Sequence, residues 1–185
     1  MRPVLTAILL IGSLVDPWAS AWATTLRKLS IDDMIQQSTA IVRVKVTGSS
    51  TAFRGKDIYT YYQLQVIENM KSTSPQSLAV AVPGGAAGGV RQMVAGAPVL
   101  AGGQDYVIFL WTSKSGLTQV IGLSQGLFAV TQNSAGAAVI VRQPSISMML
   151  NQSGQVVTDQ PVSMTLTWLR SEIQSVLGSA NGAAN

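Results

Sequence analysis

Apolar residues in the middle of the chain recur at every second position, which is the period of a half-buried β-strand. Val42, Val44 and Val46 alternate with polar neighbours, and residues 58–67 continue the alternation. A third strand is predicted at residues 78–82 and a short fourth one at residues 90–94. We expect residues 49–56 to form the loop between the first two strands, because Gly48 and Gly55 flank this polar stretch.

Residues 106–111 are apolar at every position and predict a central strand that is covered on both faces. Shorter strands are predicted at residues 117–121, 127–131 and 137–142, with Gly116, Gly126 and Gly136 in the turns. Several short strands separated by turn signals indicate a sandwich or a barrel.

A short helix is predicted near the N-terminus and a longer one near the C-terminus. Ser30 is a suitable N-cap for a helix over residues 29–38, with Asp33 three positions later as in a capping box. Near the other end, a helix with Thr165 as its N-cap should stop at Gly178. Its apolar face consists of Leu166, Leu169, Ile173, Val176 and Leu177. The predicted fold class is mainly β with a minor α part: an OB-like Greek-key β-barrel or a small sandwich, with a short N-terminal helix and a C-terminal amphipathic helix.

The first 23 residues have the pattern of a secretory signal peptide. Arg2 supplies the positive start, residues 3–15 are an apolar stretch, and Ala21-Trp22-Ala23 has the small-x-small form of a cleavage site. We predict cleavage after Ala23, with Ala21 as the second-best site, and a mature protein that is secreted or periplasmic and meets the membrane only during export. An uncleaved N-terminal anchor is the alternative.

The rest of the chain is predicted to be one domain. Residues 24–143 should form the β-barrel domain. Residues 144–185 should add a polar loop, with a hairpin around Ser153-Gly154, and the C-terminal helix, both packed on the same domain.

The amino-acid composition excludes several kinds of catalytic and metal-binding site. The chain of 185 residues has no cysteine and no histidine, which excludes disulfides, thiolate nucleophiles, Cys-type zinc sites and Ser-His-Asp triads. No cofactor is predicted. The formal net charge is +4, but the basic residues are spread along the sequence with no run longer than two. A nucleic-acid partner is therefore not expected.

One enzyme-like pattern is better explained as structure, and a second is absent. Residues 122–126 spell G-x-S-x-G, but the residues that follow read as a strand and there is no histidine base, so we predict a turn between two strands. No lysine lies three residues after a serine, so the S-x-x-K dyad is also missing. The carboxylates Asp57, Glu68, Asp105 and Asp159 are far apart in sequence and would have to converge to catalyse hydrolysis.

One loop and two tyrosines are the candidate binding residues. The segment Pro83 to Gly89 is rich in glycine and is predicted to be a wide, flexible hairpin loop. In the strand over residues 58–67, Tyr62 should face the core, while Tyr59 and Tyr61 share the other face and could stack on a ligand. The predicted binding residues are Tyr59, Tyr61, Pro83, Gly84, Gly85, Gly88 and Gly89.

The order of these elements resembles a set of bacterial secreted proteins that carry no known activity. The matching segments are Leu29-Ser30, residues 41–48, Ile58-Tyr59-Thr60-Tyr61, Pro83-Gly84-Gly85, residues 103–110 and residues 121–128. More remotely, the chain is similar to the OB barrel of netrin modules and tissue inhibitors of metalloproteinases. That resemblance implies a five-stranded Greek-key barrel, but Thr24 stands where the inhibitors have their zinc-binding N-terminal cysteine.

The leading functional hypothesis is an exported, non-enzymatic binding or interaction module for an unidentified protein or surface ligand. The alternative is an inhibitor of a secreted peptidase that works without an N-terminal cysteine. A carboxylate or Ser–Lys hydrolase is the third hypothesis.

Overall fold

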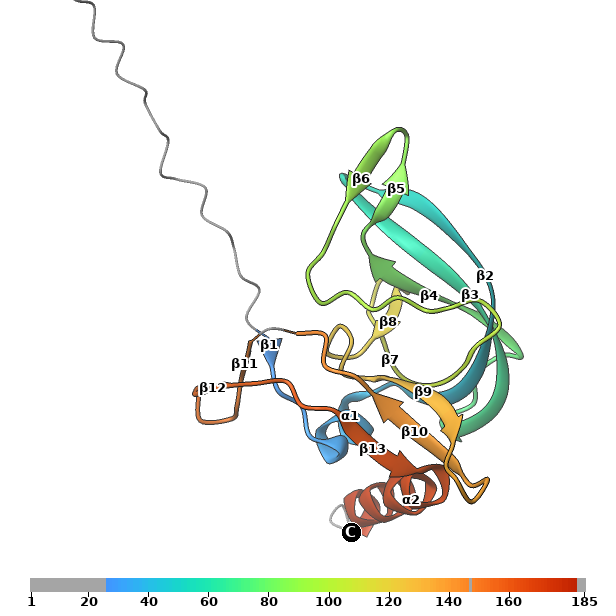
Figure 1. Cartoon of the computed structure of the whole chain (residues 1–185), viewed down its shortest axis with the longest axis vertical. Helices are drawn as coiled ribbons and strands as arrows, with labels where there is room; N and C mark the ends of the chain where they lie inside the picture. The colour runs from blue at the N-terminus through green and yellow to red at the C-terminus, as the bar shows by residue number, and fades with distance from the viewer. Residues whose placement is uncertain (1–25, 147, 183–185) are drawn as a thin grey trace, which may run out of the picture.

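A computed structural model describes residues 26–146 and 148–182 (Figure 1). The predicted signal peptide, with Ala21 and Ala23, lies outside the described residues. The two helices are α1 (Ile31–Gln37) and α2 (Leu166–Gly182). The strands are β1 (Leu26–Arg27), β2 (Ala40–Arg54), β3 (Asp57–Lys71), β4 (Ser77–Pro83), β5 (Gly85–Ala87), β6 (Val90–Gln92), β7 (Asp105–Thr112), β8 (Thr118–Val120), β9 (Leu127–Gln132), β10 (Ala138–Arg142), β11 (Met149–Leu150), β12 (Val156–Val157) and β13 (Val162–Thr165).

The main sheet has eight antiparallel strands in the order β13-β10-β9-β7-β2-β3-β4, with β8 paired to the far end of β7. The prediction of a mainly β fold with a short helix near the N-terminus and a helix at the C-terminus is confirmed. The sheet is not closed, however, so it forms no complete barrel. None of the described helices is both long enough and apolar enough to cross a membrane.

The sheet curls because the β2–β3 hairpin is long and irregular. Its register shifts at three places, one of them between Val46 and Gly48, and such bulges increase the bend and twist of a strand. The curl carries β4 round to lie next to β8 (Figure 1), although no hydrogen-bonded register joins these two strands among the described residues.

The main sheet carries a hydrophobic core on each face, which explains the continuous apolar run in β7. Val107 and Phe109 point to the face that α1 and α2 cover, where they meet Leu169. Tyr106, Ile108 and Leu110 point to the concave face. The prediction of a central strand covered on both sides is therefore confirmed.

Both helix caps are confirmed. Ser30 caps α1, with Asp33 completing the capping box, and the Thr165 hydroxyl accepts a hydrogen bond from the Trp168 amide at 3.1 Å. The C-terminal end of α1 is held by a residue distant in sequence. Lys71 of β3 donates hydrogen bonds to the carbonyls of Ile35, Gln36 and Ser38, and a cation is favourable at this end of a helix dipole.

Two expectations about element ends were wrong, and one strand was missed. The loop predicted at residues 49–56 is strand as far as Arg54, because Thr51 and Phe53 pair across the hairpin with Thr60 and Ile58. Long-range pairing here outweighs a polar local sequence. The helix α2 continues through Gly178, at a cost of about 1 kcal/mol relative to alanine. Strand β13 was not predicted, and it adds the C-terminal part of the chain to the main sheet through β10.

Candidate functional site

The predicted binding residues divide between the two faces of the β2–β3 hairpin. Tyr62 is buried on the concave face, whereas Tyr59 and Tyr61 lie on the outer face with ring centroids 6.3 Å apart. Pro83 is directly opposite Tyr59 in the β3–β4 register, so both side chains point to the same face. Pro83 therefore lies next to Tyr59 on the strand pair, at the edge of the sheet.

The glycines that follow Pro83 turn to the concave face. Gly85 begins β5, where a Cβ atom would lie 2.8 Å from Thr60 Oγ1 and 2.9 Å from Thr51 Cγ2. The strands β5 and β6 pair with each other, and Gly88 and Gly89 form their tight turn with φ angles of 55° and 76°. The predicted hairpin is therefore present, but its turn is tight rather than wide, and Gly85 packs on the face away from Tyr59 and Tyr61.

The replacement Gly85→Ala is expected to lower the free energy of unfolding by about 1–3 kcal/mol, because the backbone φ of 139° and the close threonines both oppose a side chain. Chemical denaturation measures this change. Gly55→Ala is the control, since that glycine also has a positive φ but has open space around its Cβ position. A Gly85→Ala protein no less stable than Gly55→Ala would contradict the close packing.

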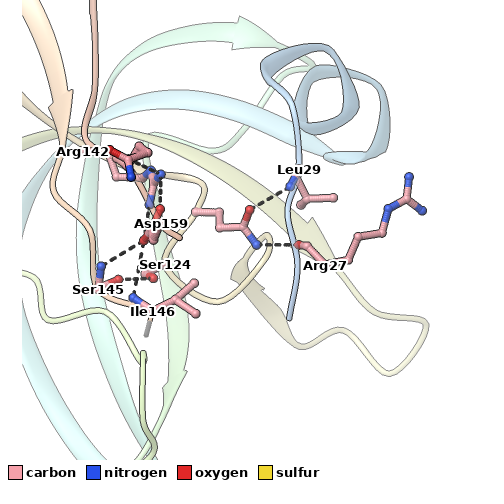
Figure 2. Close-up of polar contacts among 9 residues, drawn as sticks. Arg27, Leu29, Ser124, Arg142, Ser145, Ile146 and Asp159 are labelled. Carbon is pink, nitrogen blue, oxygen red and sulfur yellow. Dashed lines mark hydrogen bonds and ion pairs between the residues drawn. The ribbon is translucent and has the colours of Figure 1, made fainter. Parts of the chain in front are cut away.

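The G-x-S-x-G segment is a turn between β8 and β9, as predicted, and it ties three parts of the chain together (Figure 2). The side-chain amide of Gln125 accepts a hydrogen bond from the Leu29 amide at 2.8 Å and donates one to the Arg27 carbonyl at 2.9 Å. The hydroxyl of Ser124 is 2.5 Å from that of Ser145. Both Ser124 and Gln125 are buried. This turn therefore anchors the N-terminal strand and the segment after β10.

The same region contains a buried ion pair between Arg142 and Asp159 (Figure 2). Two guanidinium nitrogens donate to the two carboxylate oxygens at 2.9 and 2.7 Å, and the amides of Ser145 and Ile146 donate to Oδ2. Burial alone would raise the pKa of the Asp159 carboxyl, but these hydrogen bonds and the arginine charge outweigh burial and lower that pKa. The pair fixes the segment predicted as a polar loop to the end of β10.

The other three candidate carboxylates lie apart from one another. Asp105 Oδ2 is 2.9 Å from Arg43 Nη2, and Glu68 Oε1 is 2.7 Å from Arg170 Nε, so each forms an ion pair with a different arginine. Asp57 lies at the turn of the β2–β3 hairpin. The hydrogen bond from Arg170 lowers the pKa of Glu68. Within residues 26–146 and 148–182, no three acidic side chains gather closely enough to hold a metal ion.

A pocket that the sequence did not reveal lies where β4 and β8 approach each other without pairing. Its volume is about 300 Å³, at the lower end of the range for small-ligand sites. Gln119 is the polar side chain in a lining that is otherwise apolar and includes Leu26, Val82, Pro83, Trp111, Val120 and Leu123. Pro83 is the predicted binding residue that this pocket contains. The available sequence signal was the apolar run of residues 106–111, which ends in a tryptophan followed by polar residues.

The pocket is therefore an open recess with an apolar, uncharged lining. It lies at the open seam of the curled sheet, where β4 and β8 are not paired. The similarity to netrin modules and to tissue inhibitors of metalloproteinases stays a prediction. No protein-family model, no curated protein and no solved structure matches this chain.

Proposed function

We propose that this protein is an exported, non-enzymatic binding module and that the pocket between β4 and β8 holds an uncharged apolar group of its partner. The observation that carries the proposal is the pocket itself. It has a lining of aliphatic and aromatic side chains, and its wall includes the half-exposed indole of Trp111. Burial of apolar surface is the main driving force for such a site.

The position of the pocket also favours binding. Strand β4 ends the main sheet, and β8 pairs with β7 alone among the described strands. Val82 and Val120 of the lining are already buried, together with Val80 of the same core, so the core does not depend on what fills the pocket. A partner group can therefore enter and leave without unfolding the sheet. The amide of Gln119 can donate or accept one hydrogen bond and so orient a polar end of the ligand.

The neutral fluorescent probe N-phenyl-1-naphthylamine is expected to bind this pocket, and the replacement Trp111→Ala should weaken that binding about tenfold. The loss follows from removal of an aromatic wall that buries apolar probe surface. A fluorescence titration measures the dissociation constant. Trp168→Ala is the matched control, because Trp111 and Trp168 are each 45% exposed but Trp168 lies on α2. Equal affinity of the two variants would place the probe elsewhere.

The natural partner can then be sought through the same pocket. A photo-crosslinking amino acid at position 119 should capture it from the exported fraction, and a saturating concentration of the probe should prevent the capture. A crosslink that the probe leaves unchanged would argue against binding of the partner in this pocket.

A further inference from the structure

One end of the molecule, called the tip below, carries four basic side chains from three segments that are far apart in sequence. Arg54 and Lys56 lie at the turn of the β2–β3 hairpin, Arg91 lies in β6, and Lys114 lies in the turn between β7 and β8. All four are exposed. A contact of 3.5 Å between Arg54 Nη2 and the Ser115 hydroxyl brings the β7–β8 turn to the β2–β3 turn.

The β5–β6 hairpin joins the same tip. The Thr51 hydroxyl of β2 donates a hydrogen bond to the Ala86 carbonyl, and Ala86 is directly opposite Arg91 in the β5–β6 register. Figure 1 shows the two hairpins side by side at one end of the molecule, with α1 and α2 at the opposite end.

Large apolar side chains are exposed among these cations. Phe53 is 50% exposed and lies beside Gly88 of the β5–β6 turn. Val90, which precedes Arg91, is 55% exposed, and Met93, two residues after Arg91, is 81% exposed. The tip therefore combines positive charge with apolar groups that are in contact with water.

The charge of the molecule is asymmetric along this direction. At the tip, Asp57 is the carboxylate that opposes Arg54 in the register, so four cations and one anion leave a charge of +3. At the helical end, Asp32 and Asp33 of α1 and Glu172 of α2 are balanced by Lys71 at the C-terminal end of α1 and by Arg27 and Lys28 just before α1, so that end has no excess of either charge. Three of the other cations, Arg43, Arg142 and Arg170, are neutralised in the ion pairs described above.

We propose that this tip docks the protein on the surface of a bilayer that contains anionic phospholipid. Arg54, Lys56, Arg91 and Lys114 would contact lipid phosphates, while Phe53 and Met93 enter the headgroup region. Basic residues attract a protein to an anionic leaflet, and adjacent apolar side chains add burial that a soluble polyanion does not offer. The pocket between β4 and β8 plays no part in this contact, so the proposal is independent of the proposed function.

Vesicle co-sedimentation tests the proposal, with the chain from Thr24 onward so that the N-terminal apolar stretch makes no contribution. This chain retains every described residue and both cores. It should bind phosphatidylglycerol–phosphatidylcholine vesicles and not pure phosphatidylcholine vesicles, and binding should weaken as salt is added. The double variant Arg54→Gln, Lys56→Gln should lower the partition coefficient about 30-fold, or about fivefold for each cation.

Two controls separate the tip from net charge and from general hydrophobicity. Arg27→Gln, Lys28→Gln removes the same charge from an exposed site outside the tip and should leave binding within about twofold of the original. Phe53→Ser should weaken binding and Trp168→Ser should not, although the two aromatic rings are similarly exposed.

Three results would overturn the proposal. The first is no binding to anionic vesicles at low salt. The second is an equal loss in the Arg27, Lys28 variant. The third is binding to single-stranded RNA, rather than to vesicles, that depends on Arg54 and Lys56, which would assign the tip to a nucleic acid. All variants should keep the original circular dichroism spectrum, because the replaced side chains are exposed.

Discussion

The replacement Asp159→Ala is expected to lower the free energy of unfolding by about 3–5 kcal/mol, because it leaves the buried Arg142 guanidinium without its counter-charge. The carboxylate also accepts hydrogen bonds from the amides of Ser145 and Ile146, which would lose their partner. Urea denaturation followed by circular dichroism measures the change.

The control for this prediction is the pH dependence of the difference in stability between the original protein and Asp159→Ala. The pKa of Asp159 is lower in the folded protein than in the unfolded chain. Its contribution to stability is therefore complete above the unfolded value, about 3.9, and is lost as the pH falls through the folded value. The difference between the original protein and Asp159→Ala should be constant near neutral pH and shrink below about pH 4. A difference below about 1 kcal/mol at pH 7 would show that the pair does not hold the segment after β10.

The replacement Phe109→Ala is expected to cost about 3–5 kcal/mol, through loss of buried surface and creation of a cavity. Phe109 is completely buried and its ring centroid is 5.7 Å from that of Phe128 on β9. It lies in the core that joins the sheet to α1 and α2, so its removal weakens the contact between the sheet and both helices.

The matched control lies two residues further along the same strand. Trp111 is larger than Phe109 but 45% exposed, so Trp111→Ala should change the free energy of unfolding by less than about 1 kcal/mol. Chemical denaturation of both variants makes the comparison. A similar cost at the two positions would mean that the helices do not cover the sheet at Phe109.

Much of the local structure could be predicted from the sequence. The capping box of α1 needs only Ser30 and Asp33, which are three residues apart, and the apolar run of β7 needs only its own length and composition. Caps and strand periodicity are local properties, because the interacting groups lie within a few residues of one another.

The ends of elements were predicted less well, because distant residues decide them. Residues 49–54 continue β2 since β3 supplies a partner for each of them, and the short β13 exists since β10 offers it an edge. Neither segment has strong strand character by itself. The strand pairing that stabilises these two segments comes from partners that are distant in sequence, so the local pattern does not reveal it.

The candidate sites show the same limit. Tyr59 and Tyr61 were assigned to a common face by the two-residue period alone, and the structure agrees. Sequence reasoning also joined them to Gly85, Gly88 and Gly89, but the chain after Pro83 crosses to the other face, a path that local preferences do not specify. The sequence places Arg54 and Lys56, Arg91 and Lys114 in three separate segments, and only tertiary contacts bring these segments to one tip.

The sequence by itself therefore determined the mainly β class, the two helices with their caps, the central strand and the exclusion of histidine and cysteine chemistry. Those properties depend on composition and on contacts between near neighbours. The tertiary structure alone decided the open seam between β4 and β8, the ion pair of Arg142 with Asp159 and the charged tip. Each of these features forms between segments that are distant in sequence. The curvature of the β2–β3 hairpin and the packing of a core on each face of the sheet determine which of these segments come into contact.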